Sequence, residues 1–170
     1  MPEIERILVA NQGYAAARAN LSSAMPGRHL AVVTCMDARI DVFAVLGLNL
    51  GDAHVIRNAG GRVTEDVLRS LALSVHVLGV DTIVVMQHTK CGVSGVSDDE
   101  LRRLTGADLD FFAFDDHAVA LRQDVDRLTT TPFLHPVRTI AGLVYDVETG
   151  ALGDVVRWER PTDAVASVSG

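Results

Sequence analysis

The chain has 170 residues, enough for one domain with a sizeable core, and its 48% apolar and 22% charged residues are an ordinary globular balance. The formal net charge of −7, without a basic cluster, argues against nucleic acid or an anionic membrane as a partner. No apolar run is long enough to span a membrane and the first residues are not a signal peptide, so we expect a cytoplasmic protein.

The first third of the chain alternates between helical and strand patterns. Residues 3–19 predict a helix with a weak apolar stripe, which needs a partner surface to be stable. A short apolar run predicts a buried strand at 29–34, and a short helix is expected at 41–46. A second strand, at 53–57, is followed by the small residues 58–61, which indicate a loop that passes close to another segment.

The middle of the chain carries helix start signals. Thr64, followed by two acidic residues, is a typical N-cap, and the helix that it opens is expected to run to about residue 78. A third strand is expected at 82–86. Residues 97–100 form a capping box that opens a short helix, and a longer helix is expected at 116–128.

The last strands complete an α/β fold. A fourth strand is expected at 139–147 and an edge strand at 155–158. Strands that alternate with helices predict a mainly parallel sheet of about four strands plus this edge strand, flanked by helices. We expect a single domain over residues 1–160, with the N-terminal helix as an arm and residues 161–170 as a flexible tail.

Three chemistry-bearing side chains follow the first predicted strand at alternate positions: Cys35, Asp37 and Arg39. If the extended backbone continues past the strand, these side chains share one face at the carboxyl end of the sheet. Each residue also has an ordinary explanation. A lone cysteine after an apolar run is usually a buried structural residue, and an Asp–Arg pair is usually a weak surface ion pair.

The second cysteine favours a metal site. His88 and Cys91 follow the third predicted strand and are separated by two residues, a spacing at which a tight turn can direct both at one cation. With Cys35 they form a set of three ligands whose types favour zinc. Three protein ligands leave one coordination position open, which is typical of a catalytic site. Two cysteines in a reducing compartment also fit metal binding better than a disulfide.

Three sequence blocks resemble the signature blocks of the β-class carbonic anhydrases. They are Cys-Met-Asp-Ala-Arg at 35–39, Val-Ile-Arg-Asn-Ala-Gly at 55–60 and His-Thr-Lys-Cys-Gly at 88–92, in the family's order. The resemblance is close over residues 29–92 and general elsewhere. It implies a zinc enzyme, with one Zn²⁺ per chain, that interconverts carbon dioxide and bicarbonate. It also implies a homodimer, or in some members a tetramer, onto whose partner subunit the N-terminal arm crosses.

The resemblance assigns roles to residues that match its motifs. It implies three zinc ligands, a catalytic dyad beside the metal, and a glycine packed close to the site: Cys35, His88 and Cys91; Asp37 and Arg39; and Gly92. Arg57, Asn58 and Gly60 are expected to build the wall of the substrate pocket near a subunit boundary, although the same block could be a turn with an exposed arginine. Two residues depart from the usual pattern. Ala38 stands where many members have serine, and Lys90 occupies a variable position.

Asp37 could take either of two roles in this chemistry. It can accept a hydrogen bond from a zinc-bound hydroxide and orient it, while Arg39 keeps the carboxylate ionised. Alternatively, Asp37 itself fills the fourth coordination position in a closed form of the site, with Arg39 deciding between the two arrangements.

Two other functions remain open at this point. Carbonyl sulfide and carbon disulfide are also linear and electrophilic, so a hydrolase for either substrate on the same fold would use the same metal chemistry. A zinc-binding regulatory module without turnover is the third reading, and it predicts a permanently closed fourth position.

Overall fold

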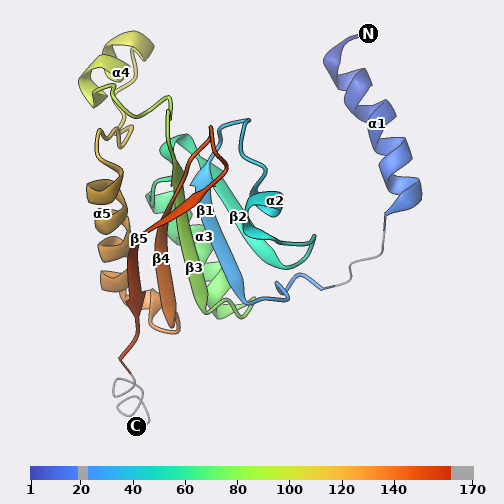
Figure 1. Ribbon diagram of the computed structural model, residues 1–170. Coiled ribbons are helices and arrows are strands. Elements are labelled where there is room, and N and C mark those ends of the chain that lie inside the picture. The colour runs from blue at the N-terminus through green and yellow to red at the C-terminus, as the bar shows by residue number, and fades with distance from the viewer. Residues whose placement is uncertain (19–22, 162–170) are drawn as a thin grey trace.

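The computed structural model describes residues 1–18 and 23–161, and it confirms the expected α/β class (Figure 1). Five strands form one sheet in the order β2-β1-β3-β4-β5. Their bounds are β1 Leu30–Cys35, β2 Ala53–Asn58, β3 Thr82–His88, β4 Thr139–Tyr145 and β5 Leu152–Glu159. The first four strands in chain order are parallel, and β5 pairs antiparallel with β4 at the edge.

The helices also follow the sequence pattern. They are α1 Glu3–Ala17, α2 Val42–Leu46, α3 Glu65–His76, α4 Asp98–Thr105 and α5 His117–Thr130, with two short 3-10 turns, η1 Ala59–Gly61 and η2 Pro132–Leu134. The Thr64 side chain accepts a hydrogen bond from the Val67 amide, as expected of an N-cap, and Ser97 does the same for Glu100. These caps fix where α3 and α4 begin, at the carboxyl edge of the sheet.

The core lies on both faces of the sheet. On one face, apolar residues of α3 and α5 pack against alternate residues of β1 and β3, among them Leu71, Leu121 and Ile83. On the other face, α2 and the segment after it cover Val32 and Met86, and this second cluster includes Cys35 and Cys91. The two cysteines therefore belong to the apolar interior and not to a loop in solvent.

The strand bounds differ from the prediction by two residues or more at three strand ends. β3 continues to His88, so this histidine is the last residue of a strand. β4 ends at Tyr145, and β5 begins at Leu152 because a turn closed by the Asp146–Ala151 hydrogen bond brings the chain straight back. The first residues of β5 are exposed, so they carry no alternating pattern that would have revealed the strand.

The N-terminal helix stands apart from the sheet in Figure 1. None of its side chains is buried among the described residues. Residue 19 of the expected arm, and residues 162–170 of the expected tail, lie outside the described residues, and the domain boundary at 160 stays a prediction. In the described part of the chain, no helix is both long and apolar enough to cross a bilayer.

Candidate metal centre

Three candidate ligands lie together at the carboxyl edge of the sheet. Cys35 ends β1, His88 ends the neighbouring strand β3, and Cys91 follows in the next turn. Their ligand atoms all lie within 4.8 Å of one another, and the two Sγ atoms are 3.8 Å apart. Lys90 takes a positive φ of 54° in the turn between His88 and Cys91, and this conformation lets the chain double back within two residues. The sequence-predicted set is therefore assembled in space.

His88 is oriented as a ligand. Its Nδ1 lies 2.9 Å from the Thr89 carbonyl oxygen, so this nitrogen carries the proton in the neutral ring and donates it. Nε2 then presents a lone pair toward the sulfurs. It is buried and has no hydrogen-bond partner among the described residues. A buried nitrogen left unpaired beside two thiols is unfavourable unless a cation binds there, so the donor set fits zinc.

The thiols have strongly shifted pKa values. A hydrogen bond from Cys91 lowers the pKa of Cys35 to about 4, and contacts with His88 and the backbone amides of Asp37 and Gly60 act in the same direction. The same contact with Cys35, together with burial, raises the pKa of Cys91. Burial lowers the pKa of His88, but the charge of the adjacent Cys35 thiolate and the hydrogen bond to the Thr89 carbonyl outweigh burial and raise it. The cluster thus holds one thiolate, Cys35, which can bind a cation.

The expected Asp37–Arg39 pair is formed, but a turn forms it and not an extended strand. β1 ends at Cys35, and the Ile40 amide bonds the Asp37 carbonyl at 3.1 Å, so the expected strand alternation past Cys35 is wrong. Arg39 donates to both carboxylate oxygens of Asp37, at 2.9 and 2.7 Å. This pairing holds the pKa of the Asp37 carboxyl well below its usual range.

The pair is tied to the candidate ligands. Arg39 also donates to the Lys90 carbonyl at 3.0 Å, which joins the dyad to the turn between His88 and Cys91. One carboxylate oxygen of Asp37 lies 3.7 Å from Nε2 of His88. An isolated surface ion pair would have neither contact, so this pair is part of the site.

Arg57 binds backbone and is not merely exposed. Its guanidinium donates to the carbonyl oxygens of Cys35 at 2.9 Å, Asp37 at 2.7 Å and Ile40 at 3.3 Å. All three belong to the turn that carries Asp37. Arg57 therefore clamps this turn, and its expected place in a substrate-pocket wall stays a prediction.

The small residues after β2 approach the site, whereas Gly92 does not. A Cβ atom placed on Gly61 would lie 2.8 Å from the Cys35 backbone nitrogen, and one on Gly60 would lie 3.3 Å from the Phe114 ring. The Asn58 side chain closes this turn through hydrogen bonds to both backbone groups of Arg62. A Cβ on Gly92 would meet no described atom within 4 Å. The close packing expected at Gly92 is therefore not seen, and Gly61 is the glycine that has it.

Two buried polar pairs beside the site were missed by sequence reasoning. Arg62 forms an ion pair with Asp124 of α5 at 2.8 Å, and both side chains are buried. Gln87, next to the His88 ligand, contacts His117 at 2.9 Å with its amide oxygen, and its amide nitrogen has no partner within the described ranges. An arginine directly after Gly-Gly was the one available signal, and nothing in the sequence pointed to its partner.

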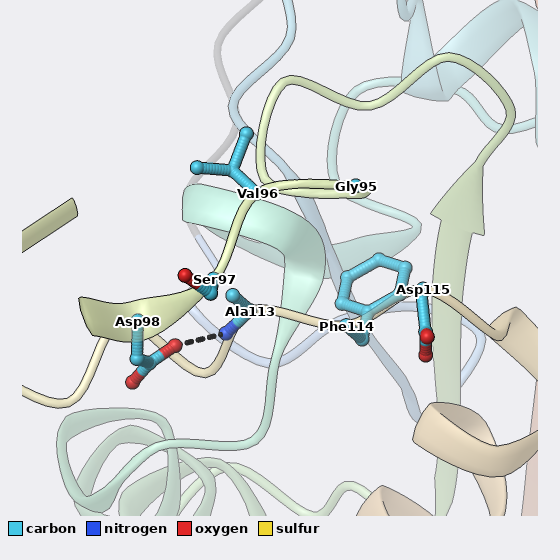
Figure 2. Close-up of a pocket in the computed structure, with 7 residues that line it drawn as sticks. All are labelled: Gly95, Val96, Ser97, Asp98, Ala113, Phe114 and Asp115. Carbon is cyan, nitrogen blue, oxygen red and sulfur yellow. Dashed lines mark hydrogen bonds between the residues drawn. The ribbon is translucent and has the colours of Figure 1, made fainter. Parts of the chain in front are cut away.

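A cavity of about 510 Å³ lies nearby, between residues 95–98 and residues 113–115 (Figure 2). None of the three candidate ligands is among the described residues that line it. The Asp98 carboxylate on its wall is already bound by the amides of Phe111 and Ala113. The cavity is thus separate from the candidate metal centre, and Phe114 and Gly95 on its wall lead from one region to the other.

The mainly parallel sheet, with a buried Cys-His-Cys cluster at its carboxyl edge, defines an α/β protein with a candidate metal centre whose donor set suits zinc. Comparison with known proteins places it more closely. The family model described as carbonic anhydrase matches residues 30–108. Beta-carbonic anhydrase 1 of Mycobacterium tuberculosis is 42% identical over 136 residues, which cover 76% of this chain and 83% of the relative. The chain belongs to the β-carbonic anhydrase family.

Two further similarities bear on structure and activity. The crystal structure of a carbonic anhydrase from Streptococcus mutans matches with a TM-score of 0.82 and 40% identity, over 92% of this chain and 99% of that chain. A carbon disulfide hydrolase of Acidithiobacillus thiooxidans is 34% identical over 151 residues, covering 74% of this chain and 76% of the relative. The family thus includes relatives named for two reactions.

Proposed function

We propose that this chain is a zinc-dependent carbonic anhydrase that interconverts carbon dioxide and bicarbonate. Cys35, His88 and Cys91 would hold one zinc ion per chain. The observation that carries the proposal is the buried, unpaired Nε2 of His88, which faces two thiols 3.8 Å apart. The carboxylate–guanidinium pair beside these ligands then has a catalytic use.

Zinc, when bound, supplies Lewis acidity that lowers the pKa of a water molecule toward neutrality, as in the three-histidine carbonic anhydrases. The chain's own residues position the reactants. Cys35, His88 and Cys91 would hold the zinc as three ligands and leave room for water, and both cysteines would bind as thiolates. Thiolates transfer more charge to the metal than imidazoles do, so the protein must help to orient the attacking water.

Asp37 is suited to this task. Its pKa is held low by Arg39, so the carboxylate is ionised throughout the neutral range and can accept a hydrogen bond from the water. Arg57 fixes the carbonyl of the same residue at 2.7 Å, which restrains the turn. The same proposal includes a second arrangement of the site. In that arrangement, Asp37 would leave Arg39 and would itself become the fourth zinc ligand.

The test is stopped-flow carbon dioxide hydration on protein of measured zinc content, from about pH 6.5 to about pH 9. Activity should rise with pH, and His88→Ala should abolish both the activity and the zinc. His135→Ala is the matched control, because this exposed histidine follows η2 and precedes the start of β4, at the opposite edge of the sheet. Zinc-loaded protein with no hydration activity at any pH would refute the proposal.

Carbon disulfide or carbonyl sulfide hydrolysis is the second candidate, because the carbon disulfide hydrolase of Acidithiobacillus thiooxidans is 34% identical. Release of hydrogen sulfide from each substrate, measured on the same zinc-loaded sample, separates the two activities. A sample that holds zinc and turns over none of the three substrates would instead fit a regulatory zinc module.

We also propose a cytoplasmic homodimer as the working form. The support is α1, which exposes Ile4, Ile7, Leu8 and Val9, each more than half accessible. A single helix of this length is marginally stable in water, so it needs an apolar surface to cover these side chains. A second copy of the chain supplies such a surface, and a tetramer would extend the same arrangement.

A further inference from the structure

Arg62 is the most deeply buried arginine among the described residues, with 5% of its surface accessible. It links two segments that contact the candidate ligands. Its Nε donates to Asp124 of α5 at 2.8 Å. One terminal nitrogen donates to the Phe112 carbonyl at 3.0 Å, and the guanidinium stacks over the Phe114 ring, 5.5 Å from its centroid. The second oxygen of Asp124 accepts from the Val63 amide at 3.1 Å.

The first segment is the turn that packs on Cys35. Asn58 closes this turn by accepting from the Arg62 amide at 2.9 Å and donating to the Arg62 carbonyl at 2.7 Å. Gly61 lies so close to the end of β1 that a Cβ there would be 2.8 Å from the Cys35 nitrogen. Any displacement of Arg62 therefore moves a group that contacts the first ligand.

The second segment follows Cys91. The Gly95 amide donates to the Phe114 carbonyl at 3.1 Å, and both residues are among those that line the cavity in Figure 2. The Ser94 amide bonds the Cys91 carbonyl at 3.1 Å. Phe114, held by Arg62, thus restrains the short loop that starts at the third ligand.

We propose that Arg62 and Asp124 are positioning residues of the metal centre, because together they fix the two loops that contact Cys35 and Cys91. This inference rests on the proposed zinc site. Stability alone explains the pair poorly, since a buried ion pair is often no better than apolar side chains of the same volume. The planar fork of arginine, in contrast, binds a carboxylate, a carbonyl and an aromatic face at fixed angles.

The test is zinc affinity, measured by competition with a chromogenic chelator, in two variants. Arg62→Met/Asp124→Leu removes both charges, so neither is left buried and unpaired. Arg62→Lys keeps the charge but loses the fork. The control is Arg69→Met/Asp66→Leu, which removes an exposed pair of 2.9 Å on α3. Loss of groups around metal ligands typically weakens binding about 10- to 100-fold, and we expect at least the lower figure for both test variants and no change for the control.

A second measurement separates positioning from general support of the fold. Cobalt-substituted protein shows thiolate-to-metal charge-transfer bands, whose energies report the surroundings of the sulfurs. We expect these bands to shift in folded test variants and to stay in place in the control. Folded variants with the affinity and bands of the wild type would overturn the proposal. So would failure of every test variant to fold beside a folded control, since the pair would then serve the fold as a whole.

The outcome for the wild type separates this inference from the proposed function. If the unmodified protein binds no zinc, the metal centre itself is refuted, and the positioning role falls with it. If the wild type binds zinc and the variants bind it equally well, the metal centre stands and only the role of Arg62 and Asp124 is refuted.

Discussion

Gly61→Ala tests how tightly the turn after β2 packs on the candidate metal centre. Gly61 has a φ of 64°, and a Cβ there would lie 2.8 Å from the Cys35 nitrogen, 2.9 Å from the Thr34 carbonyl carbon and 3.1 Å from the Met86 oxygen. All three are backbone atoms of the two central strands, so none can rotate away. The new methyl group must displace either the turn or the strand end that carries Cys35.

The expected cost has two parts. A left-handed backbone costs a residue with a side chain about 1–2 kcal/mol. Inserting a methyl group into a filled interior costs about 1–3 kcal/mol more, so the total is roughly 2–5 kcal/mol. Gly106→Ala is the matched control, because Gly106 has a φ of 70° but no described atom within 4 Å of its Cβ position. For Gly106→Ala, only the cost of the left-handed backbone applies. Both variants also lower the conformational entropy of the unfolded chain, so this effect cancels when the two are compared.

Urea denaturation of both variants measures the difference. Gly61→Ala should unfold more easily than Gly106→Ala by about 1–3 kcal/mol. In thermal unfolding of a chain of this size, Gly61→Ala should then have a melting midpoint lower by roughly 2–12 °C. It should also bind zinc more weakly than the control. Equal stability of the two variants would refute the reasoning, because the close approach of the turn to Cys35 would then carry no energetic cost.

Three further predictions concern the metal, the dyad and the arm. Cys91→Ser should bind no zinc. In the wild type, zinc at a thousand times its Kd should stabilise the fold by about 4 kcal/mol. Removing this zinc with a chelator should therefore lower the melting midpoint by about 8–16 °C. Arg39→Ala should raise the pKa of Asp37 in carbon-13 NMR titrations. Because Arg39 depresses that pKa on folding, it adds stability above the unfolded pKa of Asp37 that is lost as the pH falls through the folded value, and the variant should lack this slope. The same variant should show a changed zinc coordination shell in X-ray absorption, and an unchanged shell would contradict control of Asp37 by Arg39. Removing residues 1–19 should leave a folded monomer in sedimentation velocity; a dimer of unchanged affinity would contradict the role of the arm.

The fold could be predicted because buried parallel strands are continuous apolar runs and because the helices begin with explicit caps. β1 and β3 carry such runs, and Thr64 and Ser97 cap their helices as predicted. β5 was placed three residues late because its first residues are exposed on an edge strand. Its start is set by pairing with β4 across a turn, and no local pattern records that pairing.

The candidate ligands could be predicted for a different reason. The chain has only two cysteines, and each candidate ligand lies at the end of a strand or just after it, so parallel pairing alone brings them to one edge. The surrounding network could not be predicted in the same way. Arg62 and Asp124 are far apart in the sequence, and only the packing of α5 on the sheet makes them partners. For Arg57 the residue type was noted, but a guanidinium can bind carbonyls as well as a substrate, and only the structure separates the two.

The contacts of Asp37 show how the two readings of this residue relate to each other. Both of its carboxylate oxygens face Arg39, and its backbone carbonyl is held by Arg57. One oxygen is only 3.7 Å from Nε2 of His88, so the carboxylate needs a small rotation, and no movement of the turn, to reach the candidate ligands. That rotation would break two charge-assisted hydrogen bonds to Arg39 while leaving the Arg57 clamp intact. We therefore expect Arg39 to determine the free-energy difference between the two arrangements, and Arg57 to keep both of them within reach of the same site.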